Sequence, residues 1–210
     1  IIFKTMNELR KTQAKGKKNP IGGHFDYGRQ GTSTTFILQQ MLKKMEDCYH
    51  VFLTPTGFGS VFLSIFSIVR PGDEILVADP VYYPTRVLTQ DFLKSFDVKT
   101  VFYNPHDLNT LKRKITKKTK LIYVESPGSN SFEFQDLSKI VSIAKKYKLF
   151  SVIDNTWATP YFLKPIKLGF DMSIVSATKY YSGHSDVMGG SLAVNKRVFK
   201  HVQKANKITG

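Results

Sequence analysis

The sequence predicts an α/β fold in which helices cover both faces of a mostly parallel sheet. From about residue 50 onward, short apolar runs alternate with segments of helical periodicity, the order expected when crossover helices join parallel strands. The apolar runs are nearly continuous, which is typical of strands buried on both faces. With 210 residues, the chain is long enough to bury a sizeable core. We therefore expect one large domain.

Six apolar runs are the expected strands of this sheet. They span residues 74–79, 98–104, 120–127, 149–156, 171–178 and 190–195. Helical patterns separate several of them, at residues 83–96, 107–115 and 136–147. In the last of these segments, Ile140, Val141 and Ala144 recur on one helical face. A turn of small residues at the start of segment 54–69 leads into one more apolar helix.

The N-terminal segment differs from the rest in composition. Residues 1–45 are polar and contain glycines, so we expect an arm that ends in the start of a helix, followed by the large domain at 46–210. No run of 18 apolar residues is present, which argues against a membrane span. The basic start lacks the apolar core of a secretion signal, and the lone Cys48 fits a reducing compartment. We expect a cytoplasmic protein.

The chain is strongly basic, with 31 Lys and Arg against 16 Asp and Glu and a formal net charge of +15. The densest run, at residues 110–120, holds basic side chains between 112 and 120 without interleaved aromatic residues. It matches no nucleic-acid motif, so a solvated helix face and loop is the favoured interpretation. A nucleic-acid binder is a distant alternative, which salt-dependent retention on DNA would reveal.

Two features lie where apolar segments begin or end. The turn before the helix at 57 would leave the N–H groups near Gly57 and Phe58 free to hold a phosphate, although packing also favours glycine there. Asp154 ends an apolar strand, where an unpaired acid is costly. A salt bridge or helix cap would satisfy it, and so would a protonated ring nitrogen.

The third feature is a lysine among small and hydroxylated residues, in SATKYYSGHSDVMGG at 176–190. The amine of Lys179 can form an imine with an aldehyde, and Ser176 and Thr178 flank it at positions able to bind a phosphate. An amine, a phosphate site and an acid for a ring nitrogen together describe pyridoxal 5′-phosphate (PLP). Strand ends converge at one edge of a parallel sheet, so separation in sequence does not prevent a shared site.

Six ordered motifs give the sequence a family resemblance. They are YGRQGTSTTF, TPTGFGS, DPVYYPT, VESPGS, VIDNTWATP and SATKYYSGHSDVMGG. By these motifs the chain resembles the Cys/Met-metabolism (trans-sulfuration) family of PLP-dependent enzymes. The first and fourth motifs are most similar to the cystathionine β-lyase branch. The resemblance implies the large-domain fold of these enzymes and PLP as the cofactor, and it implies no metal site.

The resemblance also implies the roles of the site residues. Lys179 would bind PLP covalently and take the substrate Cα proton, and Tyr82, the second candidate catalytic residue, would stack on the ring unless it is an ordinary core aromatic. Asp154 would pair with the ring nitrogen. The phosphate would be held by Gly57, Phe58, Ser176 and Thr178.

Two arm residues and two loop residues complete the implied set. Tyr27 and Arg29 would reach the phosphate site of a neighbouring subunit, which implies a homo-oligomer whose dimers share active sites, with tetramers among full-length relatives. His184 and Asp186 belong to the lysine motif, but hydrogen bonding within the loop suffices to explain them.

The implied reaction is β-elimination of cystathionine, a small amino-acid thioether, to homocysteine, pyruvate and ammonia. Family members also carry a C-terminal domain whose arginine grips the substrate carboxylate, and nothing in residues 1–210 matches it. We therefore expect a truncated chain with weak or no lyase activity by itself. The alternatives are a γ-lyase or γ-synthase of the same family, or a non-catalytic PLP-binding remnant of a decaying gene.

Overall fold

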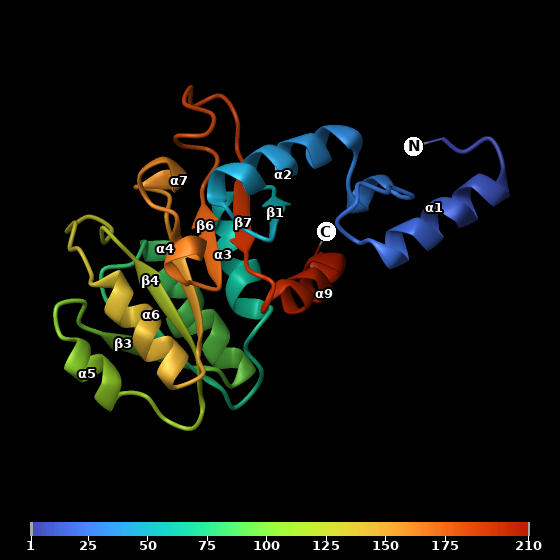
Figure 1. Cartoon of the computed structure of the whole chain (residues 1–210). Coiled ribbons are helices and arrows are strands. Elements are labelled where there is room, and N and C mark those ends of the chain that lie inside the picture. Colours follow the sequence, from blue (N-terminus) through green and yellow to red (C-terminus); the bar gives the residue numbers. More distant parts are fainter. Residues whose placement is uncertain (1, 210) are drawn as a thin grey trace.

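A computed structural model describes residues 2–209. Its centre is a seven-stranded sheet in the order β1-β7-β6-β5-β4-β2-β3, with helices packed around it (Figure 1). The strands are β1 (His50–Thr54), β2 (Glu74–Ala78), β3 (Lys99–Tyr103), β4 (Thr119–Glu125), β5 (Phe150–Asp154), β6 (Met172–Val175) and β7 (Gly190–Val194). The helices are α1 (Met6–Lys18), α2 (Ser33–Glu46), α3 (Gly57–Phe66), α4 (Tyr83–Val87), α5 (Leu108–Arg113), α6 (Leu137–Lys146), α7 (Thr159–Phe162), α8 (Pro165–Leu168) and α9 (Phe199–Thr209).

The sheet is mostly parallel, as the sequence predicts. Strands β3, β2, β4, β5 and β6 pair in parallel, whereas β7 runs antiparallel to both β6 and β1. The six expected strands all form. The seventh strand, β1, was not predicted from the sequence. It lies beside β7 at one edge of the sheet.

Apolar side chains fill the layers on both faces of the sheet. Ile75, Leu121 and Val152 in the central strands have no exposed surface, and burial of such a side chain stabilises the fold by about 1.5–3 kcal/mol. On β7, alternate residues serve opposite faces: Leu192 joins the cluster that includes α3, and Ala193 joins a smaller cluster that includes α2. Helices α2 and α3 therefore cover opposite faces at this end of the sheet.

The helical segment after β2 is less regular than predicted. The expected helix at 83–96 forms as α4, a π-helical turn at Leu88–Phe92 and a 3-10 turn at Leu93–Phe96. The hydroxyl of Thr100 on β3 donates to the carbonyl of Thr89, and a side chain that takes a helix carbonyl disturbs the regular α-helical ladder. The segment ends at Asp97 in the left-handed conformation, with φ of 57°.

The N-terminal segment contains a helix that the sequence analysis did not predict. Helix α1 buries none of its residues and lies away from the sheet (Figure 1). Its start is stabilised by Thr5, whose hydroxyl accepts from the N–H of Glu8 at 3.2 Å. A short 3-10 turn at Gly28–Gln30 then leads to α2, which begins at the Thr32 capping box. Among residues 2–209, no helix is long and apolar enough to cross a bilayer.

Candidate functional site

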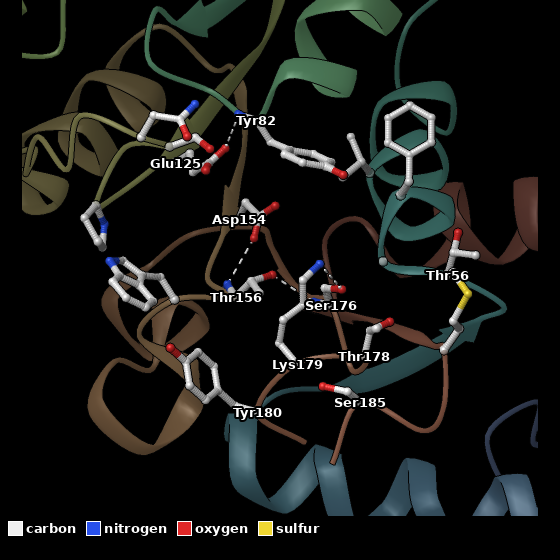
Figure 2. A pocket seen from close by; sticks show the side chains of 18 of the residues that line it. Thr56, Tyr82, Glu125, Asp154, Thr156, Ser176, Thr178, Lys179, Tyr180 and Ser185 are labelled. Atoms are coloured by element: carbon white, nitrogen blue, oxygen red, sulfur yellow. Dashed lines mark hydrogen bonds between the residues drawn. The ribbon is translucent and has the colours of Figure 1, made fainter. Parts of the chain in front are cut away.

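The carboxyl ends of the parallel strands open onto a cavity of about 1050 Å³ (Figure 2). Ligands of open α/β sheets bind at this edge. The side chains of Tyr82, Asp154 and Lys179 line the cavity, together with the start of α3 and the loop between β6 and β7. The structure thus brings together residues from four separate segments of the sequence.

Two acidic residues lie side by side at the floor of the cavity. Glu125 and Asp154 are register partners at the ends of β4 and β5. Glu125 Oε2 accepts from the N–H of Tyr82 at 2.7 Å, and Asp154 Oδ1 accepts from the N–H of Thr156 at 3.0 Å. Within residues 2–209, neither carboxyl forms an ion pair with a basic side chain. The pair is therefore available to a cationic partner in the cavity.

Burial determines the protonation of this acid pair. Burial, reinforced by the charge of Asp154, raises the pKa of Glu125 to about 8. Burial also raises the pKa of Asp154, while the hydrogen bonds from Thr156 and the charge of Lys179 oppose the rise. Two neighbouring buried carboxyls cannot both ionise cheaply, so the cofactor-free pair retains a proton near neutral pH. A positively charged N–H would favour ionisation of Asp154.

Lys179 reaches the cavity from the loop that follows β6. Its Nζ donates to Ser176 Oγ at 3.1 Å and faces the ring of Tyr82, 6.0 Å from the ring centroid. The N–H of Ser176 donates to Thr156 Oγ1 at 2.9 Å, which ties the lysine segment to the end of β5. The amine thus lies in the cavity beside the hydroxyl of Ser176, as Figure 2 shows.

The start of α3 lines one corner of the cavity with free backbone N–H groups. Thr56 caps the helix by accepting from the N–H of Gly59 at 2.9 Å, while the N–H groups of Gly57 and Phe58 have no acceptor anywhere in the described chain. A Cβ atom at position 57 would lie 2.5 Å from Ser176 Cβ and 2.9 Å from Ser176 Cα, so only glycine fits. This close approach sets the free N–H groups beside the hydroxyl of Ser176.

The remaining loop residues are tied mainly to the loop itself. The hydroxyl of Thr178 donates to the carbonyl of Gly189 and accepts from its N–H, both at 3.2 Å, although Thr178 also lines the cavity. His184 Nδ1 lies 2.6 Å from the carbonyl of Ser182, a hydrogen bond within the loop of the kind expected. Asp186 lines the cavity.

Tyr27 and Arg29 are the two predicted site residues that do not line the cavity of their own chain. Tyr27 is 58% exposed, and Arg29 donates to the carbonyl of Lys207 at 2.9 Å. A role in a neighbouring subunit stays a prediction. The basic run at 112–120 extends from the end of α5 into the first residues of β4, whereas the cavity lies at the carboxyl end of that strand. In the part of the chain described, no cluster of potential metal ligands was found.

Several residues that line the cavity were not predicted from the sequence. Glu125 is the most consequential, and Thr156, Trp157 and Phe132 accompany it. Glu125 could have been found by the pattern that indicated Asp154, namely an acidic residue at the end of an apolar strand. The Phe132, Trp157 and Tyr180 rings contact one another in series, with centroids 5.6 Å and 6.2 Å apart, and these contacts are not evident from sequence.

Comparison with known proteins agrees with this geometry. Residues 2–210 match the family model described as Cys/Met metabolism PLP-dependent enzyme. The chain belongs to this family. The cystathionine β-lyase of Haemophilus influenzae is 34% identical over 100% of this chain and 52% of its own length. An L-alanine/L-glutamate racemase of Wolbachia pipientis is 32% identical over 90% of this chain and 47% of its own length.

A solved structure shows the same fold. A Campylobacter jejuni protein assigned as an O-acetylhomoserine (thiol)-lyase superposes with a TM-score of 0.84 and 29% identity, over 96% of this chain and 49% of that one. It contains a lysine that carries a pyridoxyl phosphate group. This chain spans about half the length of the curated relatives it matches.

The residues of the cavity fit PLP, the cofactor of the family. Its three recognition features are an aldehyde, a basic ring nitrogen and a phosphate. The Lys179 amine, the buried acid pair and the free N–H groups of α3 offer one partner for each. The strongest sign is the acid pair, because buried carboxyls without a cation are costly and a ring N–H⁺ would compensate them.

Proposed function

We propose that the protein is a PLP-dependent carbon–sulfur lyase that catalyses β-elimination of cystathionine to homocysteine, pyruvate and ammonia. The observation that carries this proposal is the convergence of the Lys179 amine, the Asp154 carboxyl and the free N–H groups of α3 on one cavity. When bound, PLP supplies an aldehyde that captures amines and a ring that withdraws electrons from Cα. The protein supplies binding, orientation and proton transfer.

We expect Asp154 and its neighbours to determine how strongly the pyridine ring of PLP withdraws electrons. The Asp154 carboxylate would accept the N–H of the ring nitrogen and so would keep that nitrogen protonated. Glu125 lies against it and, through its bond to the Tyr82 N–H, fixes the backbone that carries the Tyr82 ring. Tyr82 would stack on the cofactor ring, and the N–H groups of Gly57 and Phe58 would hold the phosphate with the hydroxyls of Ser176 and Thr178.

Lys179 both attaches the cofactor and moves the proton. A free Lys179 amine takes the proton from the substrate Cα, and the Cβ–S bond then breaks with departure of the thiolate. Ser176 Oγ directs Nζ before and after this transfer, since it accepts from the amine at 3.1 Å. A positioned base contributes about 10²–10⁴-fold to such a step.

The branch of the family decides which bond breaks. The motifs YGRQGTSTTF and VESPGS and the likeness to a cystathionine β-lyase favour elimination at Cβ. A γ-lyase, the second candidate, would release 2-oxobutyrate in place of pyruvate. We also propose that the protein is a cytoplasmic homo-oligomer, in which Tyr27 and Arg29 contact the phosphate site of a partner subunit.

The decisive test is the site of covalent attachment. The chain is incubated with PLP, reduced with borohydride and mapped by peptide mass spectrometry. We expect the label on the peptide that contains Lys179, with none after Lys179→Ala and an unchanged yield after Lys200→Ala, a control on the exposed face of α9. Label at other lysines, with Lys179 unmodified, would refute the proposal.

A product assay tests the reaction itself. Cystathionine is supplied to PLP-loaded protein, and pyruvate and 2-oxobutyrate are separated by chromatography. For residues 1–210 alone we expect little turnover, because no carboxylate-binding arginine is assigned here and substrate orientation is worth several kcal/mol of barrier. Predominant 2-oxobutyrate would favour the γ-lyase, and conversion of L-alanine to D-alanine without pyruvate would favour a racemase.

A further inference from the structure

A buried carboxyl lies behind the loop at residues 176–189, called here the Lys179 loop. Glu46, the last residue of α2, is 1% exposed. Tyr181, two residues after Lys179, donates its hydroxyl hydrogen to Glu46 Oε1 at 3.3 Å. This bond joins residues 135 positions apart in the sequence. It links the end of α2 directly to the segment that carries Lys179.

Two serines of the sheet surround this contact. Ser173 on β6 and Ser191 on β7 point to the face that carries Ala193, because alternate residues of paired strands share a face. Glu46 Oε2 and both serine hydroxyl oxygens are buried and make no hydrogen bond of regular geometry among residues 2–209, although the Ser173 hydroxyl lies close enough to Glu46 to lower its pKa. Unpaired buried polar atoms are rare and costly, so apolar side chains would pack more stably at this place. The cluster is therefore polar at a place where packing alone would favour apolar side chains.

The Lys179 loop has two kinds of side chain, which point in different directions. Lys179 and Tyr180 line the cavity, whereas Tyr181 packs against the small cluster of Leu42, Val51 and Ala193 on the α2 face. The other hydrogen bonds near Lys179 are mostly local, such as Ser182 Oγ to the Thr178 carbonyl at 2.9 Å. Tyr181 is thus the side chain that fixes this irregular loop to a rigid helix.

We propose that Glu46 is a positioning residue for Lys179, because its hydrogen bond to Tyr181 holds the Lys179 loop in place and so sets the position of the Lys179 amine. The inference rests on the proposed function, in which Lys179 carries the cofactor. Glu46 does not line the cavity, so it acts through Tyr181 and not on the substrate.

The same carboxyl makes the contact sensitive to pH. Burial raises the pKa of Glu46 to about 7, opposed by the hydroxyls of Tyr181 and Ser173 and the charge of Lys164. Cys48 is the other titratable group that faces it. The anchored loop holds the proton more tightly than a loop open to water would. A rise in pH from 4.5 to 7 therefore favours release of the loop.

Three variants test the inference. Tyr181→Phe removes the donor while keeping the ring, Glu46→Gln keeps a carbonyl acceptor but cannot ionise, and Tyr147→Phe removes a hydroxyl from the C-cap of α6 as the matched control. Amide hydrogen exchange of the cofactor-free chain reports loop protection, after correction for intrinsic exchange rates at each pH. Borohydride trapping reports the rate of PLP capture at Lys179.

We expect Tyr181→Phe to lower protection of residues 176–189 on the order of tenfold and to slow PLP capture, with α6 unaffected. Glu46→Gln retains protection and loses its dependence on pH between 4.5 and 7, where the wild-type loop is progressively released. Tyr147→Phe behaves like the wild type.

Unchanged loop protection in Tyr181→Phe overturns the inference, and so does a loss of protection spread evenly over the chain. If Glu46→Gln fails to fold, Tyr181→Phe decides alone. If the wild type captures no PLP, the proposed function fails, yet loop protection still decides whether Glu46 anchors the loop through Tyr181.

Discussion

Replacement of Gly57 by alanine tests the proposal that the start of α3 and Ser176 bind the PLP phosphate. This site is called the phosphate corner below. The added methyl group would lie 2.5 Å from Ser176 Cβ and 2.9 Å from Ser176 Cα. Carbon atoms pack at about 3.5–4.0 Å, so the start of α3 and Ser176 must separate by roughly 1 Å. Backbone atoms form part of the obstacle, and rotation of a side chain cannot relieve it.

That displacement separates the two halves of the anion site. The free N–H groups of Gly57 and Phe58 lie on one side of the gap and the Ser176 hydroxyl on the other. Hydrogen bonds weaken beyond about 3.2 Å, so a shift of about 1 Å removes at least one bond to the phosphate. A bond to a charged group is worth about 1.5–3 kcal/mol. We therefore expect PLP affinity to fall about 10- to 150-fold.

Titration of the cofactor-free protein with PLP, followed by visible absorbance, measures this change. Gly59→Ala is the matched control, because Gly59 lies in the same helical turn and its added Cβ would approach no atom closer than 3.3 Å. Circular dichroism verifies that both variants fold. Equal affinities for Gly57→Ala and the wild type, or equal losses in both variants, would refute the assignment of this corner to the phosphate.

Three further variants test the roles of Lys179, Asp154 and Glu46. Lys179→Ala abolishes the borohydride-stable label, yet alters the free energy of unfolding by only about 1 kcal/mol, because Nζ makes one hydrogen bond; urea denaturation compares the two proteins. Asp154→Asn weakens PLP binding but stabilises the cofactor-free chain at pH 8, since both acids have raised pKa values and ionisation of the buried pair costs stability as pH rises; a loss of stability at pH 8 would contradict this. The pKa of Glu46 rises from 4.5 to about 7 on folding, so its contribution is fully present below pH 4.5 and is lost as pH rises to 7. Wild-type stability should consequently fall over that range by roughly 3 kcal/mol more than that of Glu46→Gln, and parallel urea curves for the two proteins would exclude the effect.

The buried strands were predictable because their composition leaves few alternatives. The runs that became β2, β4 and β5 are apolar on both faces, and the alternation with helical segments requires parallel crossovers. The reversed direction of β7 was not predictable, because antiparallel pairing with β6 and β1 depends on contacts between distant segments. Helix α1 was missed for the opposite reason: it has no apolar face, and only its capping residue marks it.

The candidate site was predictable where chemistry is carried by one residue and its neighbours in sequence. Lys179, Asp154 and Gly57 stand in motifs whose purpose can be argued locally, and the fold brings them to one cavity. Glu125 acquires its importance only from register with Asp154. The contact between Glu46 and Tyr181 joins residues 135 positions apart, so no local sequence pattern indicates it.

The phosphate corner exists only in the folded chain, because α3, Ser176 and the end of the β6–β7 connection come from distant segments. A Cβ atom at Gly190 would overlap the carbonyl of Thr56, so this assembly is tightly closed. PLP should consequently act as a thermal protectant: a ligand that binds only native protein adds about 2.7 kcal/mol at one hundred times its Kd. Melting curves recorded at increasing PLP concentrations would then titrate the correctly folded molecules.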